Sequence, residues 1–373
     1  MPTLNKNRFR FFSVFFFLVL FLLCLMGGVT LYSATQGGEG YRVPLHHKQA
    51  VWYVLGLASM LFLVWVGHRH LEHHAYLVYG FSLGLLVIVL LFGRSIAGAR
   101  RWIELGPLQF QPSELMKITL ILALAKYFHS NPREGGYTLW QLKVPFLIFL
   151  VPFLLVLLEP DLGTAIILLL LFAGIIVFVG LTRRSFVTLL LLGVASLPLG
   201  WSSLKPYQKE RILNFLDPSR DPLGTGYHLT QSKIAIGSGG LWGKGFMKST
   251  QARLRFLPEQ QTDFIFSVFV EEWGFAGSLV LFAGFLLLIF WALNIASSAK
   301  DRFGTILCLG VALFLAWHVV INVGMCMGLL PVVGIPLPLF SYGGSFMLAV
   351  FLGIGLLLNV YVNRFIFQPT PYR

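Results

Sequence analysis

The sequence has little charge and little cysteine. Charged residues make up 12% of the 373-residue chain, whereas a soluble domain carries about 25%. Hydrophobic residues make up 57%, and the mean hydropathy is +0.78. These values exclude an ordinary soluble domain and indicate a polytopic membrane protein. Cys24, Cys308 and Cys326 all lie in apolar runs, and because their number is odd we interpret them as packing residues rather than a disulfide or metal framework.

Several functional motifs are also missing from the sequence. It contains no P-loop, zinc motif, nucleophile elbow or dinucleotide fingerprint. It lacks segments of about ten residues with alternating hydrophobicity, which argues against a membrane barrel. Lys and Arg outnumber Asp and Glu by 28 to 15. The preference for positive charge on cytoplasmic loops explains much of this excess, so we expect no nucleic acid partner.

Apolar runs near the length of about 20 residues that crosses a bilayer follow one another along the chain. The short loops on the side of both termini carry more Lys and Arg than the loops on the other side, which places the N and C termini in the cytoplasm. We therefore expect an all-α polytopic membrane protein with one domain over residues 1–373. Its ten transmembrane helices are predicted at residues 11–32, 50–67, 75–93, 112–129, 144–159, 162–181, 186–204, 263–292, 303–328 and 343–363.

Residues 205–262 form the one extramembrane segment of any size, and the topology predicts that this long loop is extracytoplasmic. Prolines and glycines divide it into short pieces rather than a domain with its own core. We expect HLTQSKIAIGSGGLW to form short amphipathic elements on the membrane face. The loop holds nine basic and four acidic residues, so it either attracts an anionic ligand or contacts lipid headgroups.

Ionisable residues within or beside apolar spans are costly and are often functional. Glu114 and Lys117 lie three residues apart on one helical face, where they can pair with each other. Glu159 and Asp161 flank a proline between two spans and are either a solvated acidic turn or two ligands for a divalent cation. Arg101 lies in a segment with a tryptophan anchor and would meet either phosphate or lipid headgroups.

Asp263 follows Thr262, a suitable N-cap residue, and is predicted to start a helix whose dipole favours an anion. That structural role alone would explain it. An ionised carboxylate at the outer end of a membrane helix can also take a proton from a nearby hydroxyl group. Glu271 and Glu272 lie about 12 to 13 Å further along the helix. We expect them to have a structural role, facing a polar interior, a partner or a bend near Gly274.

Residues 328–345, GLLPVVGIPLPLFSYGGS, contain three prolines and cannot form a regular helix. We expect a re-entrant or surface loop that is buried against protein or lines a water-filled cavity. Its backbone N–H groups, with Ser341 and Ser345, are candidates for binding phosphate.

Six blocks of the sequence resemble, in order, the signature blocks of the SEDS family (shape, elongation, division and sporulation). These blocks are FQPSELMK, EPDLGTA, DPLGTGYHLTQSKIAIGSGGLWGKG, FLPEQQTDFIF, EEWGFAG and GIPLPLFSYGGS. The similarity covers nearly the whole chain, and QSKIAIGSGGLWGKG is more similar to the rod-shape branch than to the division branch. The chain departs from the family pattern at Gln260, Gln261 and Trp273.

The resemblance implies a ten-helix peptidoglycan glycosyltransferase of the bacterial cytoplasmic membrane that uses lipid II at an extracytoplasmic site. Asp263 matches the family's essential aspartate. The implied partner is a class B penicillin-binding protein within a cell-elongation complex, together with lipid-linked glycan and membrane lipid. The residues expected to contact substrate are Arg101, Glu114, Lys117, Glu159, Asp161, Lys244, Ser341 and Ser345.

The expected mechanism has Asp263 as general base in an inverting displacement of undecaprenyl pyrophosphate, ionised but made weakly basic by the helix dipole. Charge on the pyrophosphate would be met by Arg101, Lys117, basic loop residues or a divalent cation such as Mg²⁺ or Mn²⁺.

One alternative is a flippase or transporter of a lipid-linked precursor, because transport sites also use buried charges and broken helices. Another is a non-catalytic scaffold for a penicillin-binding protein. Against transport, the two halves of the sequence show no resemblance to each other.

Overall fold

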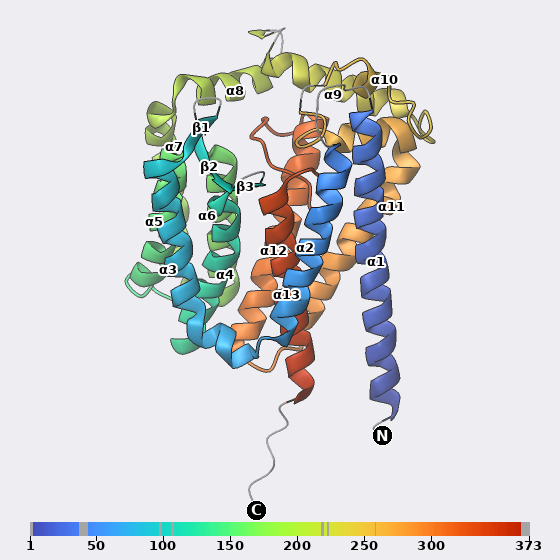
Figure 1. Ribbon diagram of the computed structural model, residues 1–373. Coiled ribbons are helices and arrows are strands. Elements are labelled where there is room, and N and C mark those ends of the chain that lie inside the picture. Colours follow the sequence, from blue (N-terminus) through green and yellow to red (C-terminus); the bar gives the residue numbers. More distant parts are fainter. Residues whose placement is uncertain are drawn as a thin grey trace, which may run out of the picture.

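A computed structural model describes residues 3–36, 44–96, 99–105, 108–217, 220–221, 224–257 and 259–366. Ten long helices run along one another in a bundle, and three short helices cross one of its ends (Figure 1). The long helices are α1 (Thr3–Thr35), α2 (Leu45–Trp65), α3 (His68–Phe92), α4 (Pro112–Ser130), α5 (Lys143–Leu158), α6 (Leu162–Val179), α7 (Arg183–Ser203), α11 (Ile265–Ser297), α12 (Arg302–Met327) and α13 (Gly344–Ile366). The short helices are α8 (Pro206–Leu216), α9 (Thr225–Gly239) and α10 (Thr250–Arg253).

Each of the ten predicted spans coincides with one long helix, which confirms the all-α polytopic membrane fold. Eight helices in the described part of the chain are long and apolar enough to cross a membrane. The other two are α5, an apolar helix of 16 residues, and α4, which carries charged side chains. The start of α1 and the end of α13 lie at the same end of the bundle, opposite α8, α9 and α10 (Figure 1). The predicted topology, with both termini on one side of the membrane and the long loop on the other, requires the termini and the short helices to lie at opposite ends.

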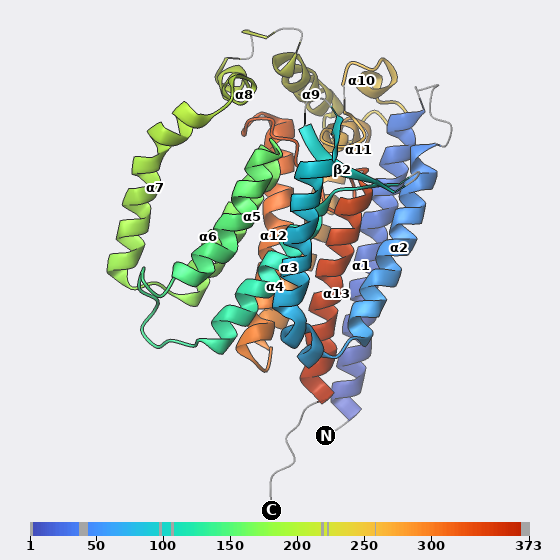
Figure 2. The same cartoon turned by 60° about the vertical axis from the view of Figure 1, so that its left-hand side comes forward.

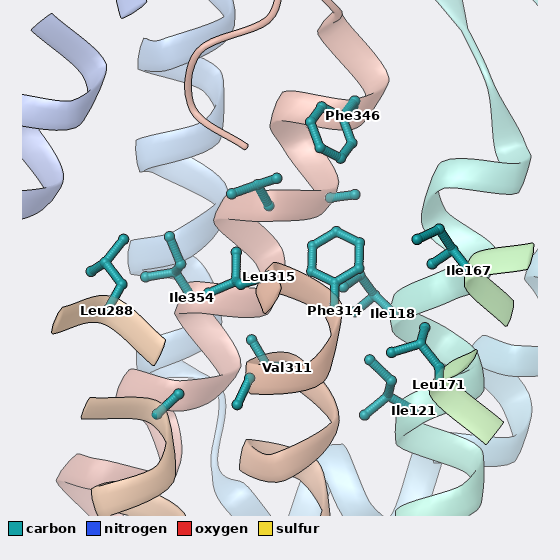
Figure 3. Packing of buried hydrophobic residues seen from close by; sticks show 14 of the residues in the cluster. Ile118, Ile121, Ile167, Leu171, Leu288, Val311, Phe314, Leu315, Phe346 and Ile354 are labelled. Carbon is teal, nitrogen blue, oxygen red and sulfur yellow. The ribbon is translucent and has the colours of Figure 1, made fainter. Parts of the chain in front are cut away.

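The centre of the bundle is built around α4, which contacts α3, α5, α6, α12 and α13. Small residues let neighbouring helices approach closely: a Cβ atom on Gly310 of α12 would lie 2.3 Å from Ile121 of α4. Because α4 is buried on nearly every side, the polar residues of its first two turns lie inside the protein. The core residues labelled in Figure 3 are Ile118, Ile121, Ile167, Leu171, Leu288, Val311, Phe314, Leu315, Phe346 and Ile354.

Helix α7 lies at the edge of the molecule, outside α5 and α6 (Figure 2). Three consecutive residues on it, Leu190, Leu191 and Leu192, are all exposed. Three consecutive side chains on a helix point in different directions, so α7 presents apolar surface around much of its circumference. This is the surface expected of a helix surrounded mainly by lipid.

A small antiparallel sheet, which the sequence did not predict, connects α3 to α4. Its strands are β1 (Arg94–Ile96), β2 (Ala99–Leu105) and β3 (Leu108–Phe110), in the order β1-β2-β3. Ile103 of β2 pairs with Phe110 of β3. Two of the strands have only three residues, too few to give a clear alternation in the sequence. The sheet lies at the same end of the bundle as α8 to α10 (Figure 1) and positions Arg101 there.

The described part of the long loop has no separate core. Helix α9 packs on α11 and α12, and Leu229, Ser232 and Ala235 are buried; its position at the membrane face stays a prediction. The Oγ atom of Ser232 donates to the carbonyl oxygen of Cys326 at 2.7 Å. A Cβ atom on Gly239 would lie 2.2 Å from the carbonyl oxygen of Val270. Small side chains therefore bring α9 against the protein.

The predicted bend near Gly274 is confirmed. Gly274 interrupts α11 with φ 66° and ψ −165°, a conformation outside the helical region. The backbone N–H groups just after the break, on Phe275 and Ala276, donate to the carbonyl oxygens of Gly240 and Leu241 at 2.9 and 3.0 Å. The break thereby joins the membrane helix to the loop that follows α9.

Candidate active site

A cavity of about 340 Å³ opens near the end of the bundle where β2, α8 and residues 328–343 meet. Its lining is Arg101, Trp102, Gln111, Glu114, Lys117, Asp161, Thr164, Ile167, Arg211, Glu259, Thr262, Asp263, Val333, Gly334, Ile335, Pro336, Tyr342, Gly343, Ser345 and Phe346. The predicted site residues brought together here are Arg101, Glu114, Lys117, Asp161, Asp263 and Ser345. The predicted site residues outside this lining are Glu159, Lys244 and Ser341.

Asp263 lies just before α11 rather than within its first turn. The helix begins at Ile265 with Phe264 in the N-cap position, so the predicted N-cap role of Thr262 is wrong. The Thr262 hydroxyl instead donates to the backbone and side-chain oxygens of Glu259 at 3.3 and 3.2 Å. Because the Thr262 hydroxyl bonds within this local turn, it does not cap the helix. The Asp263 carboxylate lies in the cavity wall.

Two distant segments hold the backbone of Asp263 in place. The Nδ2 atom of Asn322, on α12, donates to the carbonyl oxygens of Asp263 at 2.9 Å and Ile335 at 2.8 Å. The Ser341 hydroxyl donates to the carbonyl oxygen of Thr262 at 2.6 Å and accepts from the backbone N–H of Leu337 at 2.8 Å. Ser341 is therefore a structural support. The prediction of an irregular segment beside a cavity is confirmed for residues 328–343, whereas Gly344 and Ser345 already belong to α13.

Burial raises the pKa of the Asp263 carboxyl from 3.8 to about 6. The Glu259 carboxylate raises it further, Arg211 opposes the shift, Asp161 adds to it, and a hydrogen bond from Thr262 lowers it. The expectation of a carboxylate made weakly basic by a helix dipole is therefore wrong. The reason is positional, because Asp263 precedes the helix and lies among other carboxylates.

Arg101 and Asp161 form another wall of the cavity. Arg101 donates from Nε to the carbonyl oxygen of Glu159 at 3.1 Å and from Nη2 to the carbonyl oxygen of Pro160, while its Nη1 lies 3.9 Å from Oδ1 of Asp161. Oδ1 of Asp161 caps α6 by accepting from the backbone N–H of Thr164 at 3.2 Å. Oδ2 accepts from Nε2 of Gln111 at 3.0 Å. The sheet, the α5–α6 turn and the start of α4 are thus joined at this wall.

Glu159 and Asp161 do not form the pair of carboxylates that a divalent cation would need. Glu159 is fully buried, and its two carboxyl oxygens have no hydrogen-bond partner among the described residues. Burial, reinforced by the Asp161 carboxylate and opposed by Arg101, raises the pKa of Glu159 to about 9, so it is a neutral acid at pH 7. No group of three His, Cys, Asp or Glu side chains in the described ranges is arranged to hold a metal ion. These donors do not suit a resident Mg²⁺ or Mn²⁺ site.

Lys117 forms the predicted ion pair with Glu114. Its Nζ atom lies 2.7 Å from Oε2 of Glu114 and 3.2 Å from Nε2 of His318. The ammonium group also lies 5.4 Å from the centre of the Phe346 ring. Lys117 is 1% exposed and lines the cavity, so its charge is available only to a group that enters the cavity.

Lys244 pairs with a carboxylate of α11 instead of lining the cavity. Its Nζ atom lies 2.5 Å from Oε1 of Glu271, and the same oxygen accepts from the backbone N–H and hydroxyl of Thr250 at 3.0 and 2.7 Å. The Ser249 hydroxyl donates to the other oxygen of Glu271. The completely buried Glu271 carboxylate therefore fastens residues 244–250 to α11, as its predicted structural role requires.

Arg211, Glu259 and Asn322 line or support the site but were not singled out from the sequence. Arg211 of α8 and Glu259 line the cavity; in the sequence Arg211 is only one of the basic loop residues that could meet pyrophosphate, and Glu259 is only part of the loop's charge. Nη1 of Arg211 also donates to the carbonyl oxygen of Val332 at 3.3 Å. The importance of Asn322 could have been predicted, because an amide side chain in an apolar helix needs polar partners.

Known proteins are similar to the chain over most of its length. A family model described as cell cycle protein, FtsW/RodA/SpoVE, matches residues 13–365. The peptidoglycan glycosyltransferase MrdB of Escherichia coli K12 is 39% identical over 348 residues, which is 93% of this chain and 92% of MrdB. A structure solved for the structural coordination of polymerization and crosslinking by a peptidoglycan synthase complex has a TM-score of 0.79 at 36% identity, covering 94% of this chain and 97% of its own. The rod shape determining protein RodA of Thermus thermophilus has a TM-score of 0.70 at 34% identity, covering 94% and 96%.

Proposed function

The chain belongs to the FtsW/RodA/SpoVE family of cell cycle proteins, and we propose that it is a peptidoglycan glycosyltransferase that polymerises lipid II. The similarity to MrdB, which is named a peptidoglycan glycosyltransferase, and the similarity to the fold of RodA support this proposal. The observation that carries it is the position of Asp263 in a polar cavity that also contains Arg101, Lys117 and Arg211. A base and several cations in one cavity suit the transfer of a sugar from a pyrophosphate.

Asp263 acts as the general base. It removes the proton from the 4-hydroxyl of the acceptor lipid II while that oxygen attacks the anomeric carbon of the lipid-linked donor. The bond between the anomeric carbon and the pyrophosphate oxygen breaks, and undecaprenyl pyrophosphate leaves with inversion at that carbon. A pKa near 6 keeps Asp263 ionised at pH 7 while making it a stronger base than an ordinary aspartate. Pyrophosphate is a good leaving group, so the reaction needs no second carboxylic acid of the kind that glycosidases use.

The cations stabilise the charge that develops on the leaving pyrophosphate. Arg101 is held by backbone carbonyl groups, and Lys117 is held by its ion pair with Glu114. Arg211 reaches the cavity from α8. Cations fixed before the reaction need no reorganisation at the transition state, which is the main advantage of such a site.

The proposed function has the active site on the extracytoplasmic side of the bacterial cytoplasmic membrane, and two observations support that side. The cavity lies toward the end of the bundle where α8 to α10 cross, away from both termini (Figure 1), and the positive-inside rule puts the termini in the cytoplasm. Polyprenyl chains of donor and acceptor then remain in lipid, while their sugars and pyrophosphates reach the cavity from water.

The partner is a class B penicillin-binding protein of the cell-elongation complex, whose transpeptidase crosslinks the new strands. Support comes from the likeness to a synthase complex in which polymerization and crosslinking are coordinated, and from the likeness to RodA.

Purified Asp263→Asn protein, assayed with lipid II in the presence of the partner, tests the function. We expect polymerisation to fall by about a thousandfold, the scale of losing a general base, while the variant still unfolds cooperatively at or above the wild-type temperature. Asp217→Asn is the matched control, because Asp217 is an exposed carboxylate that does not line the cavity and lies 3.3 Å from Arg220. Polymerisation by Asp263→Asn at the wild-type rate would remove the assignment. Lipid II flipping without polymerisation by the wild-type protein would favour the transport alternative.

A further inference from the structure

His318 lies beside Lys117 in the interior, and the mechanism above gives it no task. Helix α12 carries it, and its side chain is completely buried. Its Nε2 atom lies 3.2 Å from the Lys117 ammonium, and its Nδ1 atom lies 2.8 Å from the carbonyl oxygen of Phe314. An imidazole this close to a buried cation can be assigned a protonation state, because only one state suits the position.

The contacts of the two ring nitrogens identify that state. The carbonyl oxygen of Phe314 can only accept a hydrogen bond, so Nδ1 carries the hydrogen. A second hydrogen on Nε2 would place an imidazolium 3.2 Å from an ammonium, and repulsion between two cations away from water disfavours that arrangement. His318 is therefore a neutral imidazole, and its Nε2 accepts an N–H from Lys117.

The ring is also fixed by its neighbours. The centre of the His318 ring lies 4.4 Å from that of Phe314 and 5.0 Å from that of Phe346, with the Phe346 ring stacked at 27°. Both phenylalanines are buried. An imidazole bonded at both nitrogens and packed against two aromatic rings has little freedom to turn, so Nε2 is a fixed acceptor.

A fixed neutral acceptor directs Lys117 without cancelling its charge. Lys117 has three N–H bonds; Glu114 faces one at 2.7 Å and His318 faces another at 3.2 Å. Lys117 also lines the cavity, so its third N–H is the one that can meet a ligand there. A second carboxylate in place of His318 would also hold the ammonium, but together with Glu114 it would give the cluster a net negative charge that repels a pyrophosphate.

We propose that His318 is a positioning residue that orients Lys117 toward the pyrophosphate oxygens of the lipid-linked donor. This inference rests on the proposed function, because it assigns a geometry to the Lys117 cation invoked there. The two aromatic rings hold the imidazole, the imidazole holds the ammonium, and the ammonium meets the charge that develops on the leaving group. His318 itself touches neither donor nor acceptor.

Two substitutions at His318 separate positioning from packing. His318→Gln keeps a neutral acceptor near the place of Nε2, whereas His318→Leu fills much of the volume without an acceptor. With lipid II and the partner present, we expect His318→Leu to lower kcat about tenfold, with KM changed less than about twofold, because the lost contact acts in the transition state. We expect His318→Gln to recover kcat to within about threefold of wild type. Equal loss in both variants would overturn the proposal.

A double-mutant cycle with Lys117→Met completes the test. If His318 acts through Lys117, the loss in kcat from His318→Leu disappears in the Lys117→Met background. Independent, multiplying losses would overturn the proposal. If Lys117→Met polymerises at the wild-type rate while Asp263→Asn does not, the base assignment stands and this inference falls. Thermal unfolding of each variant shows that the comparison is made between folded proteins.

Discussion

The side-chain amide of Asn322 donates to the backbone carbonyl of Asp263 at 2.9 Å, across 59 residues of sequence. The same Nδ2 atom donates to the carbonyl oxygen of Ile335 at 2.8 Å. One amide therefore joins the residue proposed as base, the C-terminal part of α12 and the irregular segment that forms another wall of the cavity. The position of the carboxylate depends on this junction, because Asp263 lies outside the regular hydrogen bonding of α11.

Asn322→Leu should lower activity more than its effect on stability explains. The substitution removes the amide from the carbonyl group of Ile335, at a cost of about 1 to 3 kcal/mol if that group is left unsatisfied. It also loosens the backbone of Asp263, whose carbonyl oxygen keeps only the contact with Sγ of Cys326 at 3.4 Å. We expect kcat to fall at least about tenfold, because small misplacements of a reacting group are costly. The measurements are steady-state polymerisation and thermal unfolding in detergent.

Asn359→Leu is the matched control for that variant. Asn359 is also fully buried, and its Nδ2 donates to the carbonyl oxygens of Leu63 and Val66 at 2.7 and 2.5 Å. It lies on α13 and does not line the cavity. A similar loss of thermal stability with kcat near wild type is expected. Equal losses of kcat in the two variants would contradict a specific role for Asn322.

The raised pKa of Asp263 predicts the acid limb of the activity profile. A general base must be ionised, and its pKa is raised from 3.8 to about 6 mainly by burial. We expect kcat/KM to be level above pH 7 and to fall about tenfold for each pH unit below about 6. An acid limb near pH 4 would contradict the environment described for Asp263.

The same pKa predicts how stability depends on pH. Because the folded-state pKa lies above the unfolded-state value of 3.8, the folded protein holds the extra proton more tightly. The stabilising contribution of this proton is therefore present in acid and is lost as the pH rises through about 6. The ionised carboxylate therefore destabilises the folded protein at neutral pH. Asp263→Asn should unfold at a higher temperature than wild type at pH 8, by a margin that narrows at pH 5.

The helices of this protein could be predicted because each one follows from an apolar run within its own stretch of sequence. A span needs about 20 apolar residues, and every predicted span coincides with a long helix. The bend at Gly274 and the irregular segment after α12 were also predictable, because glycine and proline act locally. The sheet was not, since strands of three residues are stabilised by their neighbours more than by their own sequence.

The sequence predicted which residue types make up the site better than it predicted which atoms those residues contact. Six expected residues line one cavity, whereas Lys244 and Ser341 bond to other parts of the protein. A Lys or Ser in a loop has the same sequence signal whether its partner is a ligand or the protein itself. The direction of the Asp263 pKa shift could not be foreseen either, because Glu259 and Asp161 approach it only after folding.

Lys244→Met should weaken the fold of the extramembrane segment without changing KM for lipid II. Lys244 donates to the buried Glu271 carboxylate, which also holds Ser249 and Thr250. Removing one partner of a buried charge is destabilising by about 3 kcal/mol or more when no other donor remains; here the remaining donors reduce that loss. We expect faster proteolysis between residues 244 and 256, with kcat and KM near wild type. A raised KM without faster proteolysis would return Lys244 to the substrate site.

Gly334→Ala should impair Asp263 directly, and the chain supplies a control for its backbone strain. Gly334 has φ +75°, and a Cβ atom there would lie 3.4 Å from Oδ2 of Asp263. Gly135 has φ +80°, but no atom lies within 4 Å of an added Cβ. Both substitutions carry a similar cost of about 1 to 2 kcal/mol for a side chain in the left-handed region.

Only Gly334→Ala places a methyl group against the carboxylate, where it displaces water or an incoming hydroxyl group. We expect kcat to fall about tenfold and the acid limb to move to higher pH, because the methyl group further desolvates the carboxylate. Gly135→Ala should lose a similar amount of thermal stability while keeping both kcat and the position of the acid limb. If the two variants lose activity equally, backbone strain rather than contact with Asp263 is the cause, and Gly334 is not part of the environment that sets the basicity of Asp263.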